Sequence, residues 1–312
     1  MDFNFAIEEQ VTRNEELSML LIAGCNGHVG KEIVRKCIAR KIPARCFDIK
    51  PLELPGEDTS ALEIISGDVT KLDDVRKAVK GVDVVMDVIG MRGETKVLTH
   101  EMVEHGGMKN IIQAGKENQV KHILYTSVMG VEPNSPAMSL SAKWNTEQSL
   151  IDSGITYTIF RPSGYFVDFA EYFAPKIKKT GAFTIVGDGS TKLQPLDPVD
   201  LAEAFIQSIG NEKVKNKIVK IAGSEVFTLA GIIALVGTVV GREAKIKKMP
   251  FWLANLMFSA IALVTGKKGG KDFLYRMRRD SVCTTEEMQQ IKEAFNIEFK
   301  KLEPWLRERV KG

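Results

Sequence analysis

The feature that most constrains this chain is a glycine-spaced turn between a short apolar run and an amphipathic stretch. The run Met19–Ala23 leads directly into Gly24–Gly30, which reads GCNGHVG, and helical periodicity follows over Lys31–Arg40. A strand that passes through such a turn into a helix is typical of the first βαβ unit of a parallel sheet. Glycines let the backbone turn tightly and approach a neighbouring group, because a Cβ would block that approach.

Composition narrows the class of protein. With 312 residues, 44% of them hydrophobic, the chain can bury a large core. The formal charge of +3 is too small for a phosphate-backbone footprint, so nucleic acid is not an expected partner. The four cysteines form no C-x-x-C pair, which indicates reduced thiols, and residues 1–17 lack the features of a secretion signal. We expect a cytoplasmic protein with an N-terminal appendage over 1–17.

Apolar runs and helical stretches alternate through the first half of the chain. This alternation predicts an α/β fold with a doubly wound parallel sheet of the Rossmann type. After residue 160 the pattern becomes rich in turns and predicts a smaller C-terminal α+β lobe. The expected domains are therefore a Rossmann domain over 18–160 and a substrate lobe over 161–312, partly interleaved with the Rossmann sheet. Within that lobe, the uncharged run Val226–Gly241 predicts a buried helix.

The glycine loop, defined here as Gly24–Gly30, has the context of a dinucleotide-binding site. The helix that follows such a loop offers free N–H groups and its positive dipole end to phosphates. Asp48 ends the next apolar run, where a carboxylate accepts hydrogen bonds from the adenosine ribose. An acid at this position favours NAD(H), and the nearby Arg45 and Lys50 keep NADP(H) as the alternative.

Two later strand ends fit the same cofactor. Asp68 and Val69 follow the third expected strand, where they could meet the adenine, and Ile89 follows the fourth, where it could line the path of the dinucleotide. The alternative for each is an ordinary turn at the end of a strand.

Several motifs together resemble the atypical short-chain dehydrogenase/reductase superfamily, in its NmrA-like branch, and are similar to divinyl-protochlorophyllide reductases and isoflavone-reductase-like enzymes. The resemblance covers about 18–241. It rests on the glycine loop, Gly67-Asp68, Val120–Ser127, the helix with Lys143 and Glu147, and Tyr157–Pro162.

The resemblance implies a reactive group made of a serine, a tyrosine and a lysine. The serine ends the fifth strand, and the lysine stands four residues after the tyrosine, binds the nicotinamide ribose and lowers the phenol pKa. Ser127 and Lys143 match, but the tyrosine position is Ser139, whose hydroxyl pKa is too high to replace a phenol. Tyr165 and Tyr125 are alternative proton donors.

The predicted catalytic residues are therefore Lys143, Ser127 and Tyr165. Each has a structural alternative: a solvated helix lysine near Glu147, a strand-end hydroxyl that caps a turn, and a core tyrosine. The predicted cofactor-binding residues are Gly24, Asn26, Gly27, His28, Val29, Gly30, Asp48, Asp68, Val69, Ile89, Lys143 and Pro162.

Three functions follow, in order of preference. The first is an NAD(P)H-dependent reductase of a largely apolar small molecule, for example one with a conjugated double bond, because such chemistry does not require the missing tyrosine. The second is a catalytically silent NAD(P)-binding regulator or assembly factor. The third is a nucleotide-sugar epimerase, which depends on that tyrosine.

No metal site is expected. His100 and His105 resemble a zincin pair, but they are five residues apart and so lie about 140° apart around a helix. We interpret them as helix-surface histidines.

The run 249–266 contains no charge and is flanked by lysines on both sides. Its 18 residues only just reach the length that crosses a membrane, and Pro250, Asn255 and Ser259 weaken that interpretation. We expect a packed C-terminal helix. The alternatives are peripheral contact with an anionic membrane and a cover over a lipophilic substrate.

Overall fold

The computed structural model describes residues 19–91, 93–95, 97–265 and 269–310. The appendage expected over 1–17 lies outside the described residues. In its first half the chain alternates strands and helices. The elements are β1 (Leu20–Ala23), α2 (His28–Arg40), β2 (Ala44–Asp48), β3 (Glu63–Ser66), α3 (Leu72–Val79), β4 (Val84–Asp87), the π-helix η1 (Glu101–Gly106), α4 (Gly107–Glu117), β5 (His122–Thr126), α5 (Met138–Ile151) and β6 (Thr156–Pro162).

One parallel sheet organises this half of the molecule. Its seven strands run in the order β3-β2-β1-β4-β5-β6-β9, where β9 is Lys217–Ile221, so the chain winds outward in both directions from β1 and β4. This confirms the predicted doubly wound Rossmann sheet. In such a sheet, ligands bind outside the carboxyl ends of the strands where the winding reverses, which is here between β1 and β4.

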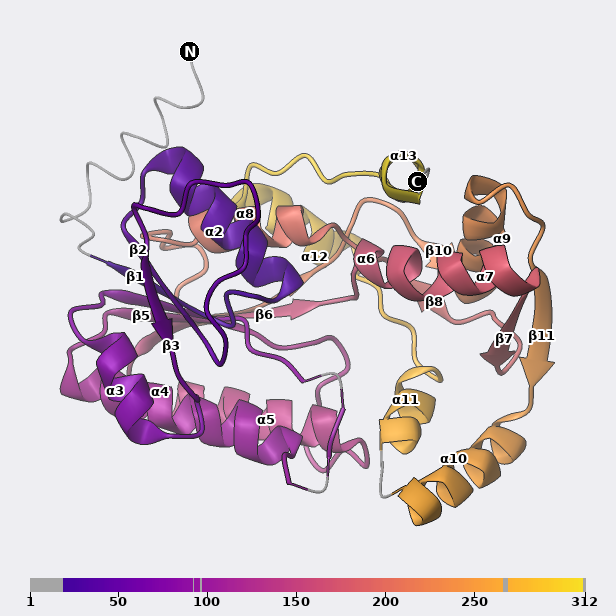
Figure 1. The fold of residues 1–312 in the computed structure, drawn as a ribbon, viewed down its shortest axis with the longest axis horizontal. Helices are drawn as coiled ribbons and strands as arrows, with labels where there is room; N and C mark the ends of the chain where they lie inside the picture. The colour runs from indigo at the N-terminus through magenta and orange to yellow at the C-terminus, as the bar shows by residue number, and fades with distance from the viewer. Residues whose placement is uncertain (1–18, 92, 96, 266–268, 311–312) are drawn as a thin grey trace.

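Helices cover both faces of the sheet (Figure 1). Leu20 and Ile22 of β1 pack in a core with α2, α8 (Pro198–Gln207) and α12 (Thr285–Ala294). Leu21 and Ala23 pack in a second core with α3, α4 and α5. Successive strand residues point to opposite faces, and all four are fully buried. The continuously apolar strand therefore serves both cores.

The second half builds the smaller α+β lobe and returns twice to the Rossmann sheet. Its elements are α6 (Phe166–Asp168), the π-helix η2 (Phe169–Phe173), α7 (Ala174–Thr180), β7 (Ala182–Val186), β8 (Lys192–Leu193), α8 (Pro198–Gln207), β9 (Lys217–Ile221), β10 (Phe227–Thr228), α9 (Leu229–Val239), β11 (Lys245–Met249), α10 (Phe251–Thr265), α11 (Gly269–Arg276), α12 (Thr285–Ala294) and α13 (Leu302–Val310). The strand β9 pairs with β6, and α8 and α12 cover the sheet. The lobe has two small sheets, β7 with β11 and β8 with β10. The buried helix expected within 226–241 is confirmed as α9.

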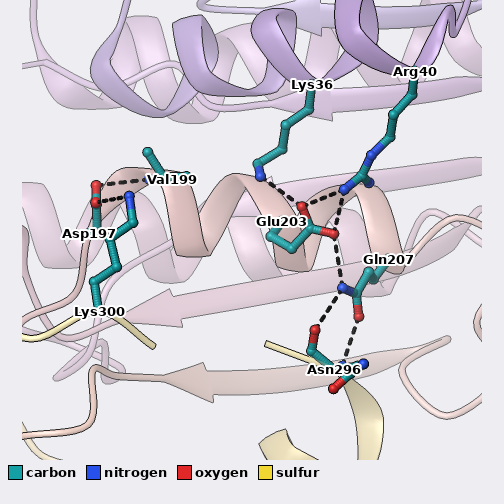
Figure 2. A network of polar contacts seen from close by, with 8 residues as sticks. All are labelled: Lys36, Arg40, Asp197, Val199, Glu203, Gln207, Asn296 and Lys300. Carbon is teal, nitrogen blue, oxygen red and sulfur yellow. Dashed lines mark hydrogen bonds and ion pairs between the residues drawn. The ribbon is translucent and has the colours of Figure 1, made fainter. Parts of the chain in front are cut away.

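A polar network fastens α8 to α2 (Figure 2). Glu203 of α8 accepts from Lys36 at 2.7 Å and from Arg40 at 2.8 Å, and its side chain is 14% exposed. Gln207, one turn later, donates to Glu203 at 2.9 Å and to the Asn296 carbonyl at 3.2 Å. Glu203 therefore links the helix that follows the glycine loop to the C-terminal part of the chain.

Two helix starts in the second half are capped by side chains. The Asp197 side chain accepts from the Val199 N–H at 3.1 Å at the start of α8, and it also pairs with Lys300 at 2.8 Å (Figure 2). Thr284 and Glu287 form a capping box at the start of α12.

The helix α10 corrects one expectation. Of its 15 residues only Ala254 is buried, so the prediction of a packed helix over 249–266 is wrong; residue 266 lies outside the described residues. The reason is placement: α10 stands at the end of the lobe against α11 (Figure 1), and it has too few neighbours to cover apolar residues on every side. No helix in the described part of the chain is long and apolar enough to cross a membrane.

Candidate functional site

The glycine loop follows β1 at the carboxyl edge of the sheet and depends on all three glycines. Gly24 has φ +87°, and a Cβ on it would lie 2.9 Å from the Ile89 nitrogen. A Cβ on Gly30 would lie only 2.2 Å from the Gly24 oxygen. Gly27 is the N-cap of α2 and has no side chain to cap the helix, which leaves the helix start open to a bound anion. The backbone therefore fits a pyrophosphate.

Asp48 and Asn26, both predicted to bind cofactor, lie in direct contact. The Asp48 carboxylate accepts from the Asn26 N–H at 3.0 Å and from the Ile49 N–H at 2.8 Å. The Asn26 amide donates to the carbonyls of 50–51, each at 3.1 Å, and accepts from the Glu53 N–H at 2.9 Å. These contacts hold the glycine loop against the segment after β2.

Arg45 is turned away from Asp48. Its guanidinium donates to Glu63 and to the Ala78 carbonyl, each at 2.7 Å, and its side chain is only 12% exposed. Of the two cations near Asp48 in sequence, Arg45 and Lys50, only the exposed Lys50 is then placed to contact a 2'-phosphate.

The parallel strands bring four predicted cofactor residues to the same edge of the sheet. Gly24, Asp48, Asp68 and Ile89 come at or just after the ends of β1, β2, β3 and β4. The Asp68 side chain accepts from the Thr70 N–H at 2.9 Å, and the Ile89 N–H donates to Asp87 at 3.0 Å.

The other predicted cofactor residues occupy different surroundings. Val29 and Val69 are buried, Val29 in the core beneath α2 and Val69 beside Gly107 of α4. The His28 ring lies 3.4 Å from Glu171 of η2. Pro162 ends β6 and is buried.

Lys143 of α5 points into the protein. Its side chain is 13% exposed, and Nζ lies 3.0 Å from the Glu104 carboxylate, 3.4 Å from the Tyr125 hydroxyl and 3.2 Å from the Thr126 carbonyl. The solvated alternative for Lys143 is therefore wrong. Its expected neighbour Glu147 instead forms a buried ion pair with Arg161 of β6.

The charged groups around Lys143 shift one another's pKa values. Burial alone would raise the Glu104 pKa, but Lys143 and His100 outweigh it and hold that pKa at about 2. Burial alone would lower the Lys143 pKa, but Glu104 outweighs it, so the pKa is raised and the lysine stays charged. We call Asp87, Glu104, Tyr125 and Lys143 the strand-end cluster.

Sequence reasoning missed two members of the strand-end cluster, Glu104 and Asp87. Asp87 ends β4 and is 3% exposed, and burial raises its pKa to about 7 although the Ile89 N–H and Lys143 favour the charged form. For Asp87 the available signal was its place as the second of two acids in the apolar run 82–88, near the end of a strand expected to be buried, because burying a carboxylate is costly. The cluster therefore holds one carboxyl that titrates near neutral pH.

Ser127 lies one residue beyond β5, but its hydrogen bonds are made to residues outside the strand-end cluster. Its hydroxyl donates to Glu147, its backbone N–H donates to the Phe160 carbonyl at 2.7 Å, and the residue is 2% exposed. The hydroxyl is thus held by the Glu147–Arg161 ion pair.

The two alternative tyrosines flank the lysine. Burial raises the pKa of both Tyr125 and Tyr165, while the Lys143 charge lowers it. Tyr125 is in contact with Lys143, whereas Tyr165 lies at the start of α6 and packs against the core beneath α2.

Ser139 occupies the expected tyrosine position, and its hydroxyl is buried with no hydrogen-bond partner among the described residues. The Thr126 hydroxyl is also buried and has no hydrogen-bond partner among the described residues. Asp272 of α11 accepts from the N–H groups of Met138 at 2.7 Å and Ser139 at 2.8 Å, so the lobe caps the helix that carries Lys143. The Ser139 and Thr126 hydroxyls therefore have unused hydrogen-bonding capacity among the described residues.

The histidine pair corrects another expectation. His100 and His105 are both buried, so their assignment to the helix surface is wrong. Each ring pairs with a glutamate four residues away: His100 lies 3.0 Å from Glu104, and His105 lies 2.5 Å from Glu101. Among the described residues, no group of three or more His, Cys, Asp or Glu side chains could hold a metal ion.

Comparison with known proteins also identifies an NAD(P)H-binding protein. The family model described as NAD(P)H-binding matches residues 24–184, slightly more than half of the chain. The photosystem II assembly factor Ycf39 of Cyanophora paradoxa is 25% identical over 237 residues, which cover 76% of this chain and 73% of that protein.

Two solved structures share the fold over nearly the whole chain. A nucleoside-diphosphate-sugar epimerase of Staphylococcus aureus has a TM-score of 0.75 at 20% identity and covers 93% of this chain and 99% of its own. The NADPH-dependent quinone oxidoreductase QOR2 of Escherichia coli, complexed with NADPH, has a TM-score of 0.70 at 18% identity and covers the same two shares.

Proposed function

The chain belongs to the NAD(P)H-binding family, in the NmrA-like branch of the atypical short-chain dehydrogenases/reductases, and from that premise we propose that it is an NAD(P)H-dependent reductase of a largely apolar small molecule. The single observation that carries the proposal is the position of Lys143. This lysine is largely buried and charged at the carboxyl ends of β4 and β5, against the Tyr125 hydroxyl. A helix lysine without such partners would be expected in solvent.

The glycine loop and the carboxylate after it account for cofactor binding. The start of α2 and the loop backbone would hold the pyrophosphate, and Asp48 would accept from the adenosine ribose. We propose NAD(H) as the preferred cofactor, because Arg45 is engaged with Glu63 rather than directed to a 2'-phosphate. NADP(H) remains the alternative, with Lys50 as its contact.

The strand-end cluster would supply charge and a proton. The bound cofactor supplies hydride when it is reduced. Lys143 holds a positive charge, which stabilises negative charge that develops on an acceptor. Tyr125, 3.4 Å from Nζ, holds a phenolic proton, and Asp87 exchanges a proton near neutral pH. Burial of these groups keeps water away from the reacting atoms.

The proposed substrate class follows from the missing phenol at the tyrosine position. With Ser139 at the tyrosine position, reduction at carbon in a conjugated system or of a quinone suits the site better than reduction of a simple carbonyl, because it does not depend on that phenol. The fold similarity to a quinone oxidoreductase agrees with this substrate class. The nucleotide-sugar epimerase is disfavoured, since its chemistry needs the phenol that Ser139 replaces.

A second candidate is a catalytically silent NAD(P)-binding regulator or assembly factor. The observation in its favour is that Ser127 is held by Glu147 and that Ser139 replaces the tyrosine, so two of the three usual reactive groups are not in place. The similarity to the assembly factor Ycf39 agrees with it.

The test is consumption of NADH and NADPH by the full-length protein with quinones, enones and azo dyes as acceptors. We expect turnover with one of these classes and a loss of about 100-fold or more in Lys143→Met, as is usual when a charged group that acts in the transition state is removed. The matched control is Lys109→Met, an exposed lysine on α4, which should leave turnover unchanged. Cofactor that binds but is never consumed would instead establish the silent alternative.

A further inference from the structure

The helix α10 exposes an unusually large apolar surface. Its large side chains are strongly exposed at Trp252 (69%), Leu256 (62%) and Leu263 (88%). These positions are 4 and 7 residues apart and fall on one side of the helix. Leu253, Met257 and Val264 are also exposed and widen the same face. We call these six residues the α10 face.

The opposite side of α10 is the one that packs on the lobe. Ala254 is buried, Phe251 lies 4.4 Å from the Arg278 guanidinium, and the Phe258 ring lies 6.3 Å from that of Phe273. The helix thus has a defined inner side, and α10 itself lies at the end of the lobe beside α11 (Figure 1). An exposed apolar surface of this size marks an interaction site in a folded protein.

Lysines surround the α10 face. The sequence from Ala244 to Lys271 contains six lysines and no Asp or Glu. Lys245, Lys247 and Lys248 are exposed on β11, which leads directly into α10, and Lys271 is exposed on α11. Asp188, which feels the charge of Lys248, is one acid close to this group, and Glu243 and Asp272 flank the range in sequence. The positive charge selects a negatively charged partner.

We propose that the α10 face and its flanking lysines bind the surface of an anionic lipid bilayer. A helix of 15 residues is about 22 Å long, shorter than the roughly 30 Å hydrocarbon core, so α10 lies along the surface with its apolar face inward. Trp252 sits at the level of the headgroups, where tryptophan is favoured, and the lysines contact lipid phosphates. An apolar substrate would then reach the lobe from the membrane.

The experiment is sedimentation of the full-length protein with vesicles. Vesicles of phosphatidylcholine alone are compared with vesicles that also contain phosphatidylglycerol. We expect binding to the anionic vesicles and a drop of about tenfold or more for Lys247→Gln with Lys248→Gln, since each lysine near a charged surface contributes several-fold to the affinity. Trp252→Ser with Leu256→Ser should abolish binding. High salt should weaken the binding of the unaltered protein.

Matched controls carry the same changes elsewhere. Val226→Ser alters an exposed apolar residue outside the α10 face, and Lys109→Gln with Lys116→Gln removes two exposed lysines from α4. Both should bind like the unaltered protein, and circular dichroism confirms that each variant is folded. The proposal is overturned if the unaltered protein does not bind anionic vesicles, or if the α10 changes leave that binding intact. It is also overturned if they only convert a dimer to a monomer, because the face then contacts a second copy.

Discussion

The glycine loop and the strand-end cluster lie at the same edge of one sheet but are built in different ways. The loop is a run of seven residues whose shape depends on the backbone, as the 2.2 Å approach of a Gly30 Cβ to the Gly24 oxygen shows. The cluster gathers side chains from β4, η1, β5 and α5, and it depends on one buried ion pair between Lys143 and Glu104. A local site of the first kind is specified by consecutive residues, and a site of the second kind by the folded chain.

The largest effect is expected where the backbone leaves no room. In Gly30→Ala the new methyl group would meet the Gly24 oxygen and the Cys25 Cα, so the loop must move away from α2. We expect cofactor binding to be lost and the free energy of unfolding to fall by about 3 kcal/mol, as overpacking of a tight contact does. Titration with NADH and urea denaturation measure the two effects.

Gly90→Ala is the control for Gly30→Ala. A Cβ at Gly90 has no protein atom within 4 Å among the described residues, so stability should not change. Normal cofactor binding by Gly30→Ala would show that the loop is not the binding site.

A smaller effect is expected in the strand-end cluster. Glu104→Gln removes the carboxylate that pairs with Lys143 and leaves a charged lysine without its partner. We expect the free energy of unfolding to fall by about 2 kcal/mol, less than for a fully buried pair, because Lys143 keeps some contact with solvent. The Lys143 pKa should also fall, which would appear as a shift in the alkaline limb of the turnover profile.

The neighbouring surface carboxylate provides the comparison for that variant. Glu101→Gln, whose partner is His105, changes a carboxylate that is 56% exposed and should alter stability little. Equal losses in the two variants would show that the Lys143 pair has no special role.

An effect of similar size, visible only as a pH dependence, comes from Asp87. Because its folded-state pKa is raised from 3.8 to about 7, the folded protein keeps this proton in that range while the unfolded chain has lost it. The folded state binds more protons there, so stability falls as pH rises from about 4 to about 7. In Asp87→Asn that fall should shrink by about 2 kcal/mol between about pH 5 and about pH 8.

Urea denaturation at those two pH values measures the effect of Asp87. The pKa of His100 is also raised, so its contribution to stability also falls as pH rises. This contribution is the same in the unaltered protein and in Asp87→Asn, so the difference between the two proteins reports on Asp87 alone. An unchanged pH dependence in Asp87→Asn would mean that the carboxyl is not buried in its acidic form.

The fold and the glycine loop could be predicted because each produces a recognisable pattern among neighbouring residues of the sequence. Two-sided burial makes β1 continuously apolar, and the glycine spacing reports a close backbone approach. Lys143 was predicted through the family resemblance, whereas Glu104 of η1 and Asp87 of β4 were not, because only folding brings them close enough to α5 to interact with the Lys143 charge. Spacing along the chain carries no information on that contact.

Two expectations failed for a related reason. The helix period placed His100 and His105 on different sides of one helix, and a surface position was inferred; in the structure each ring is buried with its own glutamate. Hydropathy likewise predicted a packed α10, although burial depends on how many neighbours the fold provides. Both errors concern burial, which tertiary structure decides.

The most direct test separates cofactor binding from chemistry in one single-turnover experiment. The protein, in excess over NADH or NADPH, is first followed by the change in cofactor fluorescence and is then mixed with a quinone to follow cofactor oxidation. The account predicts that Lys143→Met weakens binding by less than about tenfold, since the glycine loop is intact, but slows oxidation by about 100-fold or more. Oxidation at the unaltered rate in Lys143→Met, or no cofactor binding by the unaltered protein, would contradict it.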